Sequence, residues 1–407
     1  MTVSAQPADT RKTSRARARP ASFDWALLLT TGALVAFGLM MVYSTTFDWS
    51  YRVYGSPTTI FMRQVTSLGL GLAAMFILAR LDYHFLQRPW IAITIILGTI
   101  GLLIVVQVAG STVFGAKRGI FEGRYQPSEL AKLTVIIYLS VWLASRREHL
   151  RNVGYGMLPY AVIVGVVSGL ILLQPDLSAV LTIVLVGGTL FLLAGAELLQ
   201  VGIVGIISAA VASAVIAWSD TGRDRLSVYL NGLNDLTQAS WHVQQAIVAF
   251  VNGGWFGRGL GESYQKFSIL PTPHTDSIFA IVAEELGLAG SLVLIVLFAV
   301  LIWRGIKIAA NAPDFFGAIL AGGLSSWLAY EAIINIAVMV AALPFAGNAL
   351  PFISYGGSSL VVALSAIGIL LSISRHDPAD YPKRKTRAAV DLRRRGNVAR
   401  RRPARQR

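Results

Sequence analysis

The sequence contains no cysteine, so it can form neither a disulfide framework nor a cysteine nucleophile. It has only five histidines among 407 residues, and they lack the spacing of zinc ligands. Charged residues are also scarce, at 14%, whereas 55% of the residues are hydrophobic. A chain this apolar and this poor in charge is typical of a membrane protein rather than of a soluble domain.

The formal net charge of +14 is confined to the two ends of the chain. Residues 1–23 carry five basic residues and one acidic residue, and residues 375–407 carry thirteen and three. The body, residues 24–374, holds 17 residues of each sign and is neutral. A nucleic-acid-binding domain needs a basic excess to neutralise phosphates, so this distribution excludes nucleic acid as a partner.

Ten stretches are long and apolar enough to be transmembrane helices, which need about 20 apolar residues each. The predicted fold is therefore an all-α, polytopic integral membrane protein with about ten transmembrane helices. An even number of spans places both termini on one side, and basic tails and basic short loops predict that this side is the cytoplasm. The spans lie near 25–44, 62–80, 90–108, 129–145, 156–173, 178–194, 199–218, 278–303, 315–343 and 357–374.

The three predicted regions are a basic cytoplasmic tail at 1–23, a membrane domain at 24–374 and a basic cytoplasmic tail at 375–407. The composition of the C-terminal tail predicts disorder and binding to the anionic lipids of the inner leaflet. A large extracytoplasmic loop, 219–277, joins the seventh and eighth spans. Within it, WHVQQAIVAFVNGGWF is apolar at near-helical spacing with Trp241 and Trp255 near its ends, which indicates an interfacial helix.

The end of this loop carries the most informative residues, LPTPHTDS, directly before the eighth span. Two prolines shape the chain before His274, and Asp276 is expected at the outer membrane surface. Glu284 and Glu285 follow one to two turns inside the span. Carboxylates at membrane depth are costly, so these acidic residues are candidate functional groups. Asp276 could instead cap the N-terminus of the following helix, which is a common role for Asp.

A second motif, QPSELAK, suits the start of a helix. Glu129 and Lys132 are three residues apart and therefore share a face of that helix. They are candidate supporting residues of a site, although an ion pair between them could also be a purely structural clamp.

Two further motifs lie at the outer ends of spans. Asp176, in QPDL, is a candidate supporting residue or a turn and cap residue. Ser358 lies in LPFISYGGSS, whose glycines permit close backbone approach and whose hydroxyls can bind substrate. That segment could equally be a packing element.

Basic residues on the outer side are candidates for binding phosphate, because Arg forms bidentate phosphate contacts. On this side of a membrane the phosphate would belong to a lipid headgroup or to a lipid-linked substrate. Generic headgroup contact is the simpler interpretation for many of them. The candidates for pyrophosphate binding are Lys117, Arg118, Arg223 and Arg225.

These motifs together resemble the shape, elongation, division and sporulation family, typified by FtsW and RodA. The sequence differs from the family pattern at Gly119, Thr272 and Ser277. Four segments match in order over roughly residues 115–360: GAKR…QPSELAKL, QPDLS, GGWFGRGLGESYQKFSILPTPHTDSIFAIVAEELG and LPFISYGGSS.

The resemblance implies a peptidoglycan glycosyltransferase that polymerises lipid II at the outer face of the bacterial cytoplasmic membrane, in elongation or division. It also implies a class B penicillin-binding protein as the transpeptidase partner, and a divalent cation, Mg²⁺ or Mn²⁺, whose ligands the sequence does not identify. No organic cofactor is expected. The family's essential aspartate matches Asp276, its helix-borne pair matches Glu129 and Lys132, and its basic loop residue matches Arg118.

The resulting hypothesis makes Asp276 the general base, with cationic groups stabilising the departing pyrophosphate. One alternative is a lipid II flippase, for which charge deep within the spans, such as Glu331, would mark a translocation path. A second alternative is a non-catalytic scaffold for the transpeptidase.

Overall fold

The computed structural model describes residues 23–113, 116–119, 125–147, 150, 157–218, 220–267 and 270–376. All but the last residue of the predicted N-terminal tail, and all but the first two residues of the predicted C-terminal tail, therefore lie outside the described residues. In chain order the elements are α1 (Trp25–Tyr54), α2 (Thr59–Arg80), η1 (Tyr83–Phe85), α3 (Pro89–Ala109), β1 (Ser111–Val113), β2 (Ala116–Gly119), α4 (Pro127–Ser145), α5 (Leu158–Leu172), α6 (Leu177–Leu193), α7 (Leu198–Trp218), α8 (Asp220–Asn234), η4 (Leu236–Gln238), α9 (Trp241–Gly253), α10 (Ile278–Ala310), α11 (Phe315–Met339) and α12 (Gly357–Ser374).

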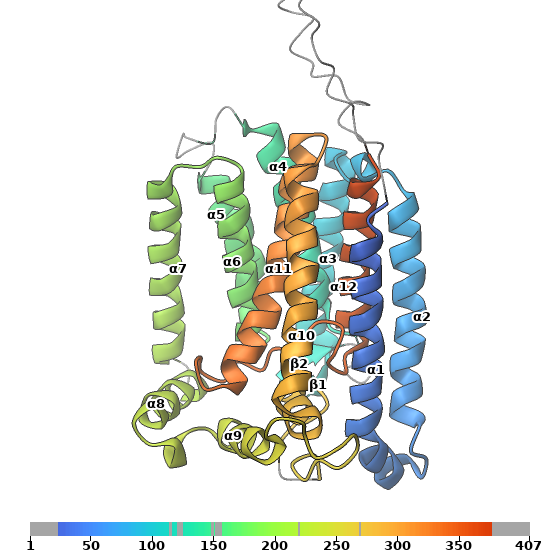
Figure 1. The fold of residues 1–407 in the computed structure, drawn as a ribbon. Coiled ribbons are helices and arrows are strands. Elements are labelled where there is room, and N and C mark those ends of the chain that lie inside the picture. Colours follow the sequence, from blue (N-terminus) through green and yellow to red (C-terminus); the bar gives the residue numbers. More distant parts are fainter. Residues whose placement is uncertain are drawn as a thin grey trace, which may run out of the picture.

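The long helices stand side by side in a single bundle (Figure 1). Each of the ten predicted spans coincides with one of these helices, which confirms the helical, polytopic fold. Helices α5 and α6 are apolar but shorter, at 15 and 17 residues. Eight described helices are long and apolar enough to cross a membrane: α1, α2, α3, α4, α7, α10, α11 and α12.

Helices α11 and α12 form the interior of the bundle, and α7 lies at its edge. In their most apolar 18-residue windows, α11 and α12 each bury 72% of the residues, whereas α7 buries none. Because α7 is nevertheless strongly apolar, its exposed Leu and Ile side chains suit a lipid environment rather than water. Polar groups within α11 must therefore find partners inside the protein.

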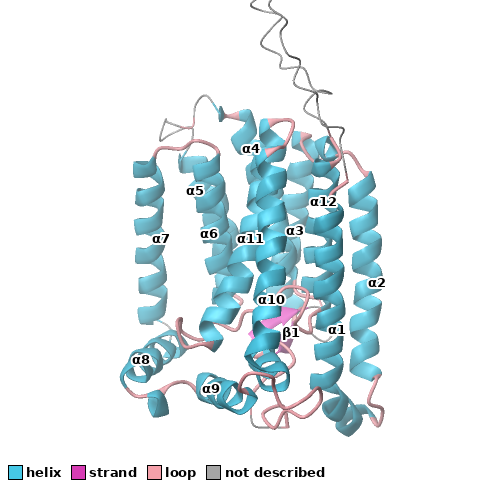
Figure 2. Cartoon of the chain, viewed as in Figure 1, coloured by secondary structure: helices cyan, strands magenta, loops and turns pink. Residues whose placement is uncertain are grey.

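The all-α prediction missed one small element, a two-stranded antiparallel hairpin in the connection between α3 and α4 (Figure 2). Strand β1 pairs with β2, and Thr112 lies opposite Lys117. Strands of three and four residues are too short for an alternating pattern to show in the sequence.

The connection between α7 and α10 is structured. It contains α8, η4 and α9, which lie across the end of the bundle (Figure 1). The segment predicted to be an interfacial helix forms α9, and Trp241 and Trp255 are 54% and 71% exposed. Helix α8 was not predicted, because its first turns are polar and charged.

The two described ends of the chain lie at the other end of the bundle. Asp24, just before α1, forms a bidentate ion pair with Arg304 near the end of α10, at 2.6–3.1 Å. Arg375, just after α12, donates to the backbone carbonyl of Ala79 at the end of α2. Both ends of the helical domain therefore share one side, as the even number of spans predicts.

Candidate active site

Asp276 lies in a tight turn that leads into α10. The turn includes Thr272, whose φ of +46° is unusual for a residue with a side chain, and the Thr275 N–H donates to the Thr272 carbonyl. The structure assigns Ser277, rather than Asp276, as the N-cap residue of α10. Asp276 is partly buried, and a Cβ placed on Gly347 would lie 3.4 Å from its Oδ2.

The segment before α12 fixes the backbone of this turn. Ser354 donates through its hydroxyl to the carbonyl of Thr275 at 2.6 Å, and the Tyr355 N–H donates to the carbonyl of His274 at 2.8 Å. Ser354 also accepts a hydrogen bond from the Leu350 N–H at 2.8 Å. The motif LPFISYGGSS therefore holds the turn that carries Asp276, which is more specific than a generic packing role.

His274 is a neutral group beside this turn. Its ring stacks on Trp49 of α1 at a centroid distance of 4.6 Å. Burial lowers the pKa of His274 to about 4, so the ring is uncharged near pH 7. It can therefore position the turn, but it does not add positive charge beside Asp276.

Two asparagines connect the turn to α11. Asn335 donates to the carbonyls of Asp276 and Asn348, at 2.8 and 2.5 Å. Asn348 in turn donates to the backbone carbonyl of Glu331 at 3.0 Å. Sequence reasoning did not select either asparagine, although Glu331 and Asn335 are four residues apart in an apolar span and so lie on one face of α11.

Lys132 lies between two carboxylates in the interior of the bundle, one of which belongs to Glu331. Its Nζ is 2.8 Å from Glu129 Oε1, which confirms the predicted pair on α4. It also forms an ion pair with Glu331 of α11. All three side chains are almost fully buried, at 12% exposure or less. The cluster ties α4 to α11 close to the Asp276 turn.

Asp176 joins the same region from α6. It is the N-cap of α6, accepting from the Ala179 N–H at 3.2 Å, which confirms the predicted capping role. It also accepts from the hydroxyls of Ser128, at 3.0 Å, and Ser178, at 2.9 Å. Ser178 reaches the carbonyl of Gly347, the residue beside the Asp276 carboxylate, at 3.5 Å. The carboxylate of Asp176 thus links the starts of α4 and α6.

Ser358, in the first turn of α12, accepts a hydrogen bond from the Gln126 N–H at 3.2 Å. Its hydroxyl therefore joins the start of α12 to the start of α4. With this contact, residues from all four sequence motifs meet at one end of the bundle, around the partly buried carboxylate of Asp276.

Comparison with known proteins agrees with this arrangement. A family model described as "Cell cycle protein", FtsW/RodA/SpoVE, matches residues 24–379. The chain belongs to this family. It is 37% identical to the probable peptidoglycan glycosyltransferase FtsW of Trichlorobacter lovleyi, over 88% of this chain and 94% of that protein. It is 35% identical to the stage V sporulation protein E of Bacillus subtilis, over 87% and 97% of the two chains.

Solved structures of the FtsW/RodA/SpoVE family share the fold. The rod shape determining protein RodA of Thermus thermophilus superposes with a TM-score of 0.64 at 26% identity, covering 87% of this chain and 97% of that one. A chain from a structure described as the coordination of polymerization and crosslinking by a peptidoglycan synthase complex gives a TM-score of 0.71 at 27% identity, covering 87% and 98%.

Of the four predicted phosphate-binding residues of this FtsW/RodA/SpoVE protein, the structure describes the side chains of two. Lys117 and Arg118 belong to β2 in the backbone, and their side chains lie outside the described part of the structure. Arg223 is exposed on α8. Arg225 is half-buried, with its guanidinium 5.9 Å from the centre of the Phe345 ring. The four residues therefore come from two separate elements, β2 and α8.

Two further carboxylates of α10 anchor the loop that precedes this helix. Glu284 accepts from Asn252, Ser263 and the N–H of Gln265. Glu285 is paired with buried Lys266 at 2.8 Å and accepts from Ser44 of α1 at 2.7 Å. Both carboxylates are fully buried and satisfied, so they support the loop rather than face a substrate.

In the described part of the chain, no three His, Asp or Glu side chains converge in a way that could hold a metal ion. The described donors therefore do not fit a site built from protein ligands alone. Mg²⁺ commonly uses one or two carboxylates together with substrate phosphates. A divalent cation thus remains an expectation for the substrate complex, and no chemical step below depends on it.

Proposed function

We propose that this protein polymerises lipid II into peptidoglycan glycan strands, as a glycosyltransferase. The observation that carries the proposal is the setting of Asp276. Its turn is held in place by α11 and by the segment before α12, while the carboxylate stays partly exposed beside Gly347. A rigidly held carboxylate that keeps access to solvent is suited to accept a proton from a substrate.

In the proposed reaction, Asp276 accepts the proton of the acceptor sugar hydroxyl as that oxygen attacks the anomeric carbon of the donor. The new glycosidic bond forms while the bond to the lipid pyrophosphate breaks, and the pyrophosphate leaves with the electron pair. Asp276 then releases its proton to solvent. A positioned base contributes about 10²–10⁴-fold to the rate. Because the leaving group is already activated, the reaction needs no protein nucleophile.

The pyrophosphate carries negative charge that the protein must stabilise as the bond breaks. We assign this role to Arg118 and Lys117 on β2, and to Arg223 and Arg225 on α8. A divalent cation bound with the pyrophosphate would supply further charge stabilisation. The neutral ring of His274 and the buried cluster around Lys132 act indirectly, by positioning the turn and the helix ends near it.

The proposal places the protein in the bacterial cytoplasmic membrane with both termini in the cytoplasm. Supporting this, both described chain ends share one side, and the basic tails predict that side to be the cytoplasm. Asp276 then faces the outer side, where lipid II is polymerised. The expected partner is a class B penicillin-binding protein, in keeping with the similarity to a chain of a peptidoglycan synthase complex.

The flippase alternative was favoured mainly by Glu331, as a charge that could line a translocation path. Glu331 is instead buried in an ion pair with Lys132, so it no longer supports this alternative. The deciding experiment uses the purified full-length chain in detergent, where transport across a membrane has no meaning. The proposal predicts glycan strands from added lipid II. Folded protein that makes no strands, alone or with a class B penicillin-binding protein, would favour a transporter or a scaffold.

A further inference from the structure

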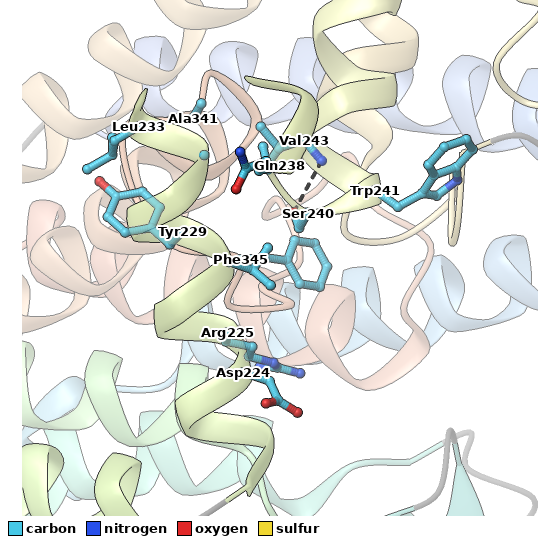
Figure 3. Close-up of a pocket in the computed structure, with 13 residues that line it drawn as sticks. Asp224, Arg225, Tyr229, Leu233, Gln238, Ser240, Trp241, Val243, Ala341 and Phe345 are labelled. Carbon is cyan, nitrogen blue, oxygen red and sulfur yellow. Dashed lines mark hydrogen bonds between the residues drawn. The ribbon is translucent and has the colours of Figure 1, made fainter. Parts of the chain in front are cut away.

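A pocket of about 360 Å³ lies between α8, α9 and the segment that follows α11. Figure 3 shows its side chains converging from these three elements. Most of the wall is apolar, and only a few polar groups line it. The apolar wall consists of Val228, Tyr229, Leu233, Trp241, Val243, Ala341 and Phe345. None of these residues belongs to the motifs that led to Asp276.

The pocket is charged at one end only. Asp224 and Arg225 lie together there, beyond Phe345, while Leu233 and Ala341 lie at the opposite end (Figure 3). Arg223 precedes them as an exposed residue of α8, outside the lining of the pocket. A pocket with apolar walls and a guanidinium group at one end matches an apolar chain that carries a phosphate.

Two side-chain contacts connect the pocket to the turn that carries the candidate base. The Phe345 ring stacks on His242 of α9 at a centroid distance of 4.0 Å. His242 Nδ1 lies 3.4 Å from the hydroxyl of Ser277, the residue after Asp276. Tyr229 also donates to the carbonyl of Ala342 at 3.0 Å, which holds α8 against this segment. Phe345 and His242 therefore connect the pocket to Ser277, the residue after Asp276.

His242, which stacks on the Phe345 ring of the pocket wall, is uncharged near neutral pH. Burial, with a smaller contribution from the nearby Arg225 charge, lowers the pKa of His242 to about 4. Arg225 is then the cation that faces a phosphate at this end, with Phe345 packed beneath it. An apolar chain can lie along the rest of the wall without burying a charge.

We propose that this pocket binds the first isoprenoid units of a polyprenyl-phosphate lipid, with the phosphate beside Arg225. The proposal rests on the proposed function, because it identifies where the lipid carrier of that substrate is held. An acyl chain of an ordinary anionic phospholipid shares the same chemistry. The polyprenyl chain is the occupant we assign, since Phe345 and His242 connect the pocket to the turn that carries Asp276.

The first test fills the pocket. Val228→Trp places an indole in its apolar wall, and Val251→Trp makes the same change at a 76%-exposed position of α9 outside it. Polymerisation kinetics are measured with lipid II carrying a long polyprenyl chain or a short farnesyl chain. Because both chains contain the first isoprenoid units, we expect Val228→Trp to raise KM roughly tenfold for both substrates, with kcat little changed. Val251→Trp should behave as the unmodified protein.

An unchanged KM, or a rise confined to the long-chain substrate, would overturn the proposal even though the enzyme is active. If the unmodified protein makes no glycan at all, the proposed function fails instead, and the pocket is tested by binding. Folding of the variants is checked by their thermal unfolding in detergent.

The second test needs no variant. A photoreactive polyprenyl monophosphate is crosslinked to the unmodified full-length protein, and the labelled peptide is identified. We expect labelling of α8 or of the start of α9, prevented by excess unlabelled polyprenyl monophosphate but not by phosphatidylglycerol. Labelling elsewhere, or equal competition by phosphatidylglycerol, would contradict the assignment.

Discussion

The side-chain amide of Asn335, on α11, donates a hydrogen bond of 2.8 Å to the backbone carbonyl of Asp276. The same amide group reaches the carbonyl of Asn348, so one buried side chain joins α11 to both segments that enclose the candidate base. The position of Asp276 is therefore determined from within the bundle, by a residue that does not itself face the substrate.

Replacing Asn335 with Ala should displace the Asp276 turn, because two buried carbonyls lose their donor. We expect glycan synthesis to fall at least about tenfold and the free energy of unfolding to fall by about 1–3 kcal/mol. Polymerisation rates and thermal unfolding measure the two effects. Asn234→Ala, at the exposed last residue of α8, is the matched control and should change neither. Full activity of Asn335→Ala would show that the turn keeps its position without this contact.

The Lys132 cluster should behave as a buried ion network. Lys132→Met leaves Glu129 and Glu331 facing each other without a cation, and we expect a loss of about 3–5 kcal/mol in unfolding free energy. Adding Glu331→Gln should restore part of it, which a double-mutant cycle measures. The exposed pair of Asp48 and Arg52 is the comparison, and Arg52→Met should cost less than about 1 kcal/mol.

If the Lys132→Met/Glu331→Gln variant regains activity along with stability, the cluster is structural. A stable double variant that stays inactive would assign these charges to the reaction itself.

Gly287, within α10, should be intolerant of any side chain. Its φ is +68°, and an added Cβ would lie 2.4 Å from the Gly257 nitrogen. At this point the backbone of residues 254–259 forms hydrogen bonds with the backbone of α10. We expect Gly287→Ala to lower the thermal stability and to expose residues 254–267 to proteolysis. Gly98→Ala is the control, since nothing lies within 4 Å of its added methyl group. Unchanged proteolysis of Gly287→Ala would mean that the loop adapts.

Stability should depend on pH through two histidines. Burial lowers the pKa of both His242 and His274 to about 4, so the unfolded chain binds more protons than the folded one between about pH 6.5 and pH 4. Stability is therefore full above about pH 6.5 and is lost as the pH falls towards 4, by up to about 1.4 kcal/mol per pH unit for each histidine.

Thermal unfolding across this pH range tests that dependence. His242→Phe keeps a ring against Phe345 but cannot be protonated, so it should reduce the slope. An unchanged slope in this variant would show that His242 does not contribute.

The sequence predicted the spans and the supporting pair because both follow simple periodicities. Apolar length identified the helices, and a spacing of three placed Glu129 and Lys132 together. The contact between Lys132 and Glu331 was beyond such reasoning, because it joins residues 199 positions apart on different helices. From the sequence, Glu331 was a charge at membrane depth that could mark a translocation path. Its ion pair with Lys132 indicates instead that it joins two helices.

The outer side of the site was harder to predict. The role of Ser354 in holding Thr275, and that of Asn335 in holding Asp276, depend on how α10, α11 and α12 pack. The hairpin of β1 and β2 is too short to leave a pattern. The apolar pocket beside α8 also arises only from tertiary packing, since its walls come from three separate segments.

The decisive test of Asp276 as the base for glycosyl transfer is polymerisation of lipid II by purified Asp276→Asn protein. Asparagine keeps the size of the side chain and leaves the backbone contact with Asn335 in place, so the variant should fold and unfold like the unmodified protein. Asp235→Asn, an exposed site in the same loop, controls for the loss of one negative charge. We expect no detectable glycan from Asp276→Asn and normal synthesis from Asp235→Asn. Near-normal synthesis by folded Asp276→Asn would contradict the assignment of Asp276 as the base.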